Sequence, residues 1–103
     1  MSLFSFLGFG SKTKAALRRG AIIIDVRTPH EYDQGRVPES INIPVDKITV
    51  NIERIKKMKR PVVFCCASGM RSGNATRILK ANGVTDVCNG GSWNNVLRIL
   101  KTI

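Results

Sequence analysis

The sequence lacks the features that mark several classes of protein. No apolar run approaches the ~20 residues that a membrane-spanning helix needs, so no membrane span is expected. His30 is the single histidine, which leaves no Cys-His spacing suited to zinc, and we expect neither a metal nor a cofactor. The three cysteines, Cys65, Cys66 and Cys88, form no disulfide framework, which fits a reducing compartment.

The first residues are apolar but do not resemble a secretion signal. Residues 1–12 have no basic stretch before their apolar part and no small-residue cleavage site, so we expect a cytoplasmic protein. A chain of 103 residues has the length of one domain, and we predict a single domain over residues 1–103. Two alternatives stay open for residues 1–10: a flexible terminus or a segment packed against the edge of the sheet.

Acidic residues are scarce, with 7 against 17 lysines and arginines, and the formal net charge is +10. A surplus of this size attracts anions of many kinds, including acidic proteins. The densest basic cluster, residues 53–60, is interpreted as a solvated helix face. Nucleic-acid binding is not expected, because neither a recognition motif nor an aromatic stacking platform accompanies the charge.

The hydrophobic pattern alternates between strand and helix periods. Continuous β-branched runs at 21–25 and 62–65 indicate strands buried on both faces, as in a parallel sheet. The alternation predicts an α/β fold. Shorter strands are expected at 41–44 and 85–89, and helices at 11–19, 29–34, 51–60, 71–82 and 92–103, the last following a turn at the Gly90-Gly91 pair.

The stretch "VVFCCASGMRSG" carries the candidate chemistry. A short loop between a strand end and a helix start can direct backbone N–H groups inward, and the helix dipole favours an anion there. Such a site lowers a thiol pKa and produces a nucleophilic thiolate. Counted from Cys66 the spacing to Arg71 suits a sulfur carrier, and counted from Cys65 it suits a cysteine phosphatase. A strand that begins at Val62 favours Cys66, but strand ends predicted from sequence shift by ~2 to 4 residues, so both remain open.

Residues 21–93 resemble the single-domain rhodaneses, which are thiosulfate or persulfide sulfurtransferases. The resemblance is carried by "IIIDVRTPHEYDQGRVPESINIP", by "CASGMRS" and by "GGSW", in that order. It implies a rhodanese-like open sheet of four to five mostly parallel strands flanked by helices on both faces. It also implies that Cys65 ends the strand and that Cys66 is the nucleophile.

The resemblance further implies a role for each site residue. Cys66 would carry sulfane sulfur as a persulfide from a small anionic donor, such as thiosulfate, polysulfide or a persulfide, to cyanide or a thiol. An acidic sulfur-relay protein is a further expected partner. Asp25, Arg27 and Glu31 would be scaffold near the site, with Arg27 paired to Glu31. The residues expected to bind substrate are Ala67, Ser68, Gly69, Met70, Arg71 and Ser72.

Some alternatives remain open from the sequence. Ala67 stands where these proteins often have an arginine, which leaves the preference for thiosulfate undecided. Arg71 can either contact substrate or brace the loop, and His30 is expected to face solvent. The competing functions are a phosphatase or arsenate-reductase-like enzyme that uses Cys65, and a non-catalytic module that binds a partner through its basic face.

Overall fold

A computed structural model describes residues 2–103, with side chains from Gly10 onward. The elements alternate along the chain as the hydrophobic pattern predicts. They are α1 (Ser2–Arg18), β1 (Ile22–Asp25), α2 (Pro29–Gln34), β2 (Ile41–Asn42), the 3-10 turns η1 (Val45–Lys47) and η2 (Thr49–Asn51), α3 (Ile52–Met58), β3 (Val62–Cys66), α4 (Met70–Ala81), β4 (Val87–Ser92) and α5 (Trp93–Leu100).

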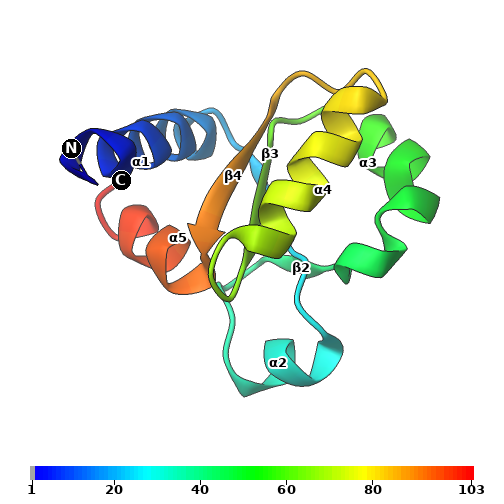
Figure 1. Ribbon diagram of the computed structural model, residues 1–103, viewed down its shortest axis with the longest axis horizontal. Helices are drawn as coiled ribbons and strands as arrows, with labels where there is room; N and C mark the ends of the chain where they lie inside the picture. The colour runs from blue at the N-terminus through cyan, green and yellow to red at the C-terminus, as the bar shows by residue number, and fades with distance from the viewer. Residues whose placement is uncertain (1) are drawn as a thin grey trace.

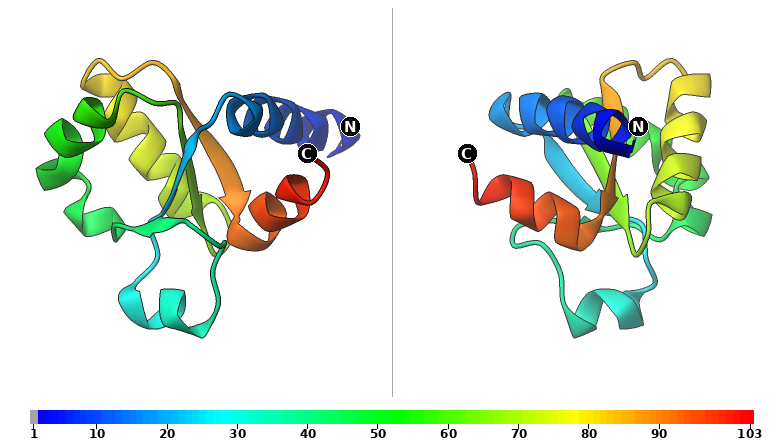
Figure 2. Two further views of the ribbon diagram at one scale, coloured as in Figure 1. Left: turned by 180° about the vertical axis from the view of Figure 1, so that it is seen from behind. Right: turned by 60° about the vertical axis from the view of Figure 1, so that its left-hand side comes forward.

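The sheet has four parallel strands in the order β2-β1-β3-β4. Figure 1 shows α1 and α5 on one face of this sheet and α3 and α4 on the other, and Figure 2 shows the same layers from behind and from the side. The short helix α2 lies beyond the carboxyl ends of the strands. The predicted fold class, an open parallel sheet with helices on both faces, is confirmed.

Strand β3 is buried along its whole length, and its side chains alternate between two cores. Val62, Phe64 and Cys66 pack with α3 and α4, whereas Val63 and Cys65 pack with α1 and α5. This alternation follows from the two-residue period of a strand. The two adjacent cysteines therefore face opposite sides of the sheet.

The N-terminal helix begins earlier than expected. The helix predicted from Ser11 starts at Ser2, so residues 2–10 belong to α1 and contribute no strand to the sheet. The sheet therefore has four strands, and neither alternative considered for residues 1–10 included a helix. Ser11 is a good capping residue, but it is also tolerated inside a helix, and the sequence has no proline before it that would force a break. The predicted end is confirmed, with Arg18 last and Gly20 at φ +83°.

The Gly90-Gly91 pair is a bulge inside β4 rather than a turn. Phe64 pairs with Asn89 and Cys66 with Ser92, so β4 holds one extra residue over this interval. A Cβ atom on Gly90 would lie 2.7 Å from Val96 Cγ2, which is closer than packed atoms approach. The glycine lets β4 pass close to α5. Asn89, which precedes it, pairs with Phe64, two residues before Cys66.

A buried ion pair holds α2 at this edge. Asp25 and Arg27 have side chains that are 0% and 6% exposed, and Arg27 Nη2 lies 2.7 Å from Asp25 Oδ2. The same guanidinium donates to the carbonyl oxygens of Glu31 and Gly35, at 3.2 and 2.6 Å, and lies 5.0 Å from the centre of the Trp93 ring. The expected pairing of Arg27 with the Glu31 carboxylate is wrong, because Asp25 occupies the guanidinium.

We predict that Asp25→Asn lowers the free energy of unfolding by about 3–5 kcal/mol, because it leaves the buried Arg27 charge without a counter-charge. Urea unfolding of the purified variant measures the change. Asp86→Asn is the matched control, since Asp86 forms an ion pair of similar length (2.8 Å) with Arg19 at the surface. Its unfolding midpoint should stay close to that of the wild type. Equal stability of the two variants would contradict the prediction.

Candidate active site

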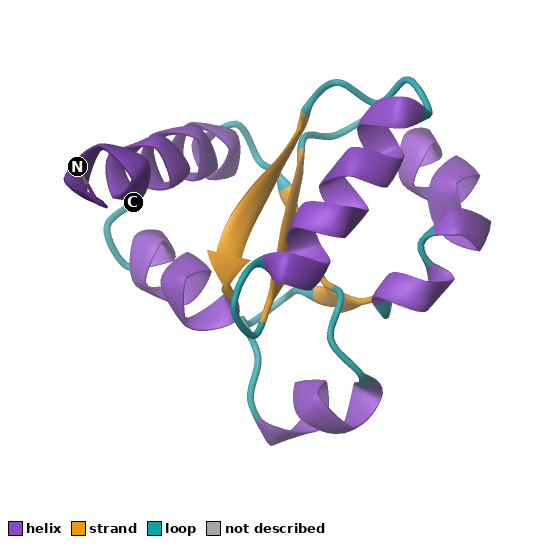
Figure 3. Cartoon of the chain, viewed as in Figure 1, coloured by secondary structure: helices purple, strands orange, loops and turns teal. Residues whose placement is uncertain are grey.

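The loop that follows β3 joins the sheet to the start of α4 (Figure 3). Cys66 is the last residue of β3, one position later than predicted, and α4 begins at Met70. Gly69 caps the helix at φ +103°, a conformation that glycine adopts without strain. The loop thus consists of residues 67–69, and the N-terminus of α4 lies beside the Cys66 side chain.

The Cys66 sulfur lies among groups that can donate hydrogen bonds. Gly69 N donates to Cys66 Sγ at 2.9 Å, and Ser72 N lies 3.5 Å from the same atom. Ser72 Oγ lies 3.4 Å from Sγ, where either atom could be the donor. Cys66 is only 1% exposed, so water is largely excluded from this contact.

These contacts lower the pKa of the Cys66 thiol. Burial by itself raises the pKa, because it disfavours the charged form. Hydrogen bonds from the Ser72 hydroxyl and from the N–H groups of Ser72, Gly69 and Ser68 outweigh burial, and the pKa falls below its ordinary value. The site therefore favours the thiolate, which is the nucleophilic form of cysteine.

The other two cysteines have the opposite tendency. Cys65 is 0% exposed on the far side of the sheet, and burial, reinforced by the nearby Asp25 charge, raises the pKa of its thiol. Burial likewise raises the pKa of Cys88, which is partly buried on β4. Among the three thiols, Cys66 is the one whose surroundings stabilise negative charge.

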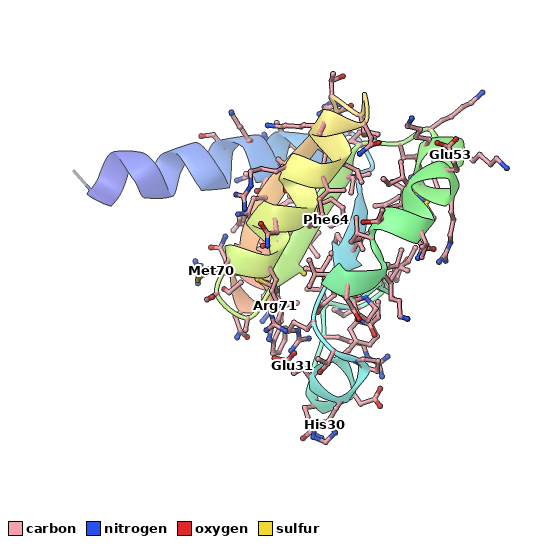
Figure 4. All side chains as sticks on the ribbon, turned by 45° about the vertical axis from the view of Figure 1, so that its right-hand side comes forward. His30, Glu31, Glu53, Phe64, Met70 and Arg71 are labelled. Atoms are coloured by element: carbon pink, nitrogen blue, oxygen red, sulfur yellow. The ribbon has the colours of Figure 1, made fainter. Side chains whose placement is uncertain are left out.

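Arg71 braces the loop against α2. Its Nη1 and Nη2 atoms lie 2.7 and 3.0 Å from the two carboxylate oxygens of Glu31, and Figure 4 shows these side chains directed toward each other. The Arg71 guanidinium, together with the backbone N–H of Thr28, lowers the pKa of Glu31 to about 2. Of the two roles considered for Arg71, the structure displays the brace.

Asn89 is a site residue that the sequence reasoning missed. Its Nδ2 donates to the Gly69 carbonyl oxygen at 2.9 Å, and its Oδ1 accepts from Ser72 Oγ at 2.6 Å. One signal was available in the sequence, because Asn89 is a polar residue near the carboxyl end of a strand, where ligands of open parallel sheets bind.

The remaining predicted residues surround the mouth of the site. Ala67 and Ser68 are exposed, and Met70 is 80% exposed and points outward in Figure 4. The N–H groups of Met70 and Arg71 belong to the first turn of α4, where an α-helix provides no acceptor. His30 is exposed on α2, as expected. A recess of about 340 Å³ beside the loop is lined by Ser68, Gly69, Met70, Asn89, Gly91, Ser92, Asn95 and Arg98.

Two properties of the described residues concern metal sites and membrane-spanning helices. Within residues 2–103, no group of three or more His, Cys, Asp or Glu side chains could hold a metal ion. Among the same residues, no helix is long and apolar enough to cross a membrane.

Comparisons with known proteins agree with this geometry. The family model of the rhodanese-like domain matches residues 11–97. The thiosulfate sulfurtransferase PspE of Escherichia coli K12 is 36% identical over 74 residues, which cover 71% of each chain.

Two solved structures share the fold. The rhodanese with anions from E. coli has a TM-score of 0.68 and 35% identity, covering 74% of this chain and 91% of that one. A Rhodopseudomonas palustris protein of unknown function, described as a possible tyrosine phosphatase, has a TM-score of 0.72, covering 89% and 78%. At 22% identity, this second likeness shows the fold alone. Because the family model spans most of the sequence, the chain belongs to the rhodanese-like domain family.

Proposed function

We propose that this protein is a sulfurtransferase that carries sulfane sulfur as a persulfide on Cys66. The observation that carries the proposal is the position of Cys66 Sγ, which lies 2.9 Å from the Gly69 N–H and beside Ser72 at the start of α4. The identity to PspE supports the same chemistry. The natural donor is proposed to be thiosulfate, a polysulfide or a persulfide, and the acceptor cyanide or a thiol.

The reaction divides into two displacements. The Cys66 thiolate attacks the outer sulfur of the donor, the S–S bond of the donor breaks, and sulfite or a thiolate leaves with the electron pair. The product is a Cys66 persulfide with its negative charge on the outer sulfur. The acceptor then attacks that outer sulfur, and the electron pair of the breaking S–S bond returns to Cys66.

The start of α4 suits the charge of this intermediate. The N–H groups of Met70 and Arg71 have no acceptor within the helix and lie in the turn that carries the positive end of the helix dipole. We propose that they bind the outer sulfur, while Gly69 and Ser72 contact Sγ. Arg71 would act through its backbone, because its guanidinium is engaged by Glu31.

Cys65 is poorly suited to the competing phosphatase chemistry. It is fully buried, faces the core formed with α1 and α5, and has a raised pKa. A phosphatase that uses Cys65 would have to rotate this residue to the other face of β3. A non-catalytic binding module would not need the hydrogen-bond donors that surround the Cys66 sulfur. A cytoplasmic location and an acidic sulfur-relay partner also remain proposals, the second supported by the net charge of +10.

The first prediction concerns the identity of the sulfur carrier. Brief exposure to thiosulfate or a polysulfide should add the mass of one sulfur atom to the wild type, and intact-protein mass spectrometry detects it. Cys66→Ser should gain none, because it lacks the nucleophile. Cys65→Ala is the control and should load like the wild type, and alanine is chosen because a buried serine would need a hydrogen-bond partner. Loading that depends on Cys65 would contradict the proposal.

A second prediction concerns the thiolate. Ser72→Ala removes a hydrogen bond to Sγ, and such a bond contributes about 0.5–1.5 kcal/mol, so the thiolate fraction of Cys66 below its midpoint should fall roughly two- to tenfold. The pH profile of iodoacetamide alkylation, with the modified cysteine assigned by mass spectrometry, measures the change. Thr76→Val, which removes a hydroxyl one turn further along α4, is the control. An unchanged profile in Ser72→Ala would overturn the assignment of this donor.

The Glu31–Arg71 brace gives a third prediction. The folded-state pKa of Glu31 is lowered from 4.5 to about 2, so its stabilisation is complete above the unfolded-state pKa and is lost as pH falls through this interval. Glu31→Gln should be less stable than the wild type at neutral pH, and the difference should shrink between these two values. Urea unfolding at several pH values measures it. Glu53→Gln, which breaks a 3.6 Å surface pair with Lys56, should show no comparable trend. A stability difference that stays constant across this interval would contradict the prediction.

A further inference from the structure

Asn89 connects two groups that flank the Cys66 sulfur from different segments of the chain. Its side-chain amide donates to the Gly69 carbonyl oxygen, while the N–H of Gly69 itself donates to Cys66 Sγ. The side-chain oxygen of Asn89 accepts from the Ser72 hydroxyl, which also lies beside Cys66 Sγ. Asn89 comes from β4, so it is placed independently of the loop it contacts.

The orientation of the Asn89 amide is fixed by its partners. The Gly69 carbonyl oxygen can only accept a hydrogen bond, so it must face Nδ2 at 2.9 Å. The Gly91 N–H can only donate, so it must face Oδ1, also at 2.9 Å. The atom 2.6 Å from Ser72 Oγ is therefore an acceptor, and Ser72 must supply the proton of that contact.

This arrangement creates a competition for one proton. A serine hydroxyl has a single hydrogen, and Ser72 Oγ lies near two atoms that can accept it, Asn89 Oδ1 at 2.6 Å and Cys66 Sγ at 3.4 Å. When Sγ is a thiol it can donate its own hydrogen to Ser72, and both contacts are satisfied. When Sγ is a thiolate it can only accept, and the hydroxyl can donate either to Sγ or to Asn89 but not to both.

We propose that Asn89 is a positioning residue that holds the Ser72 hydroxyl proton while the Cys66 sulfur is uncharged and yields it when that sulfur is a thiolate. The hydroxyl rotates about its C–O bond, and its O–H bond stays intact throughout. The change is therefore a switch of hydrogen-bond partner and not a proton transfer.

Two features of the surroundings favour this change of partner: Asn89 keeps another hydrogen bond, and water does not replace the contact between Ser72 and Cys66. When Ser72 turns away, Asn89 Oδ1 keeps the hydrogen bond from Gly91 N and is not left unsatisfied. Ser72 is fully buried, so water does not replace either of its contacts. Among the side chains that the structure describes, the partners of the hydroxyl are Asn89 and Cys66. A stronger hydrogen bond to Asn89 therefore makes the hydrogen bond to Cys66 less favourable.

In the proposed catalytic cycle the switch would follow the charge. This step rests on the proposed function. In the persulfide the negative charge lies on the outer sulfur and Sγ is neutral, so the Ser72 proton would return to Asn89. In the free enzyme the Ser72 hydroxyl would donate its hydrogen bond to the thiolate instead. Asn89 would thus favour the loaded state over the thiolate by one hydrogen bond.

The experiment compares Asn89→Ala in the wild type and in Ser72→Ala, on reduced protein without a sulfur donor. Removing the competing acceptor should increase the thiolate fraction of Cys66 roughly two- to tenfold at pH values below the midpoint of its titration. This range corresponds to the net free energy of one hydrogen bond. In the Ser72→Ala background the same substitution should have no such effect. The pH profile of iodoacetamide alkylation measures the thiolate fraction in each variant. Because alkylation does not depend on sulfur transfer, the role of Asn89 can be disproved while persulfide loading succeeds. Equally, loading can fail while the role of Asn89 is supported.

Two controls separate positioning from loss of structure. Asn95→Ala removes another amide that lines the recess but bonds to Gly90 O and not to Ser72, and its profile should match the wild type. Asn89→Leu, which has the same branched shape and the same number of side-chain heavy atoms, replaces Asn89→Ala if the latter does not fold. A smaller thiolate fraction in the Asn89 variant, or an equal shift with and without Ser72, would overturn the proposal.

The charged groups around Cys66 are the same in all these variants. Arg71 on α4 interacts with Cys66 and is paired with Glu31 on α2. Asp25 and Arg27 act on the neighbouring Cys65, and Arg98 on α5 lines the recess beside the loop. Their effect on the profile is therefore common to each comparison.

Discussion

The buried pair of Asp25 and Arg27 is the constraint on which the site depends. Taking two charges out of water is costly, and the pair is tolerated because Arg27 also donates to the carbonyl oxygens of Glu31 and Gly35. These bonds hold the middle of α2 and the residue that follows it, Gly35, beside the carboxyl ends of the strands. Glu31 is then in place to hold Arg71 at the start of α4. The buried pair is thus connected to the start of α4 through α2 and the contact of Glu31 with Arg71.

The two-residue period of β3 places the two neighbouring cysteines on opposite faces of the sheet, in different surroundings. Cys66 faces α4 and meets its N-terminus. Cys65 faces α1 and α5, where it packs with apolar side chains and lies near the charges of Asp25 and Arg27. The same residue type therefore has a lowered pKa at one position and a raised pKa at the next. A one-residue slip of β3 would exchange these environments, and the register is held by pairing with β1 and β4 on both sides.

The sequence pattern predicted most of the fold, because buried β-branched runs and helix boundaries are local signals. It could not predict the partners of Arg27 and Arg71, since both arginines have several acidic residues within reach in a chain of unknown geometry. The Glu31–Arg71 contact spans 40 residues and the Ser72–Asn89 contact spans 17. Asn89 reaches Ser72 because β4 pairs with β3, where Asn89 lies opposite Phe64. The sequence does not reveal this pairing, because the glycine pair after Asn89 is equally typical of a turn.

Persulfide chemistry makes a demand that a fixed anion site does not, because the charge alternates between Sγ and the outer sulfur. Backbone N–H groups cannot follow that movement, since their directions are set by the helix. A hydroxyl can, because it rotates and can either donate or accept. In the proposed persulfide site, the donors at the start of α4 therefore divide into two kinds. The backbone N–H groups of Gly69, Met70, Arg71 and Ser72 are fixed, and the Ser72 hydroxyl is adjustable. An adjustable donor needs a second acceptor to hold its proton when the sulfur does not, and Asn89 Oδ1, 2.6 Å away, is placed to be that acceptor.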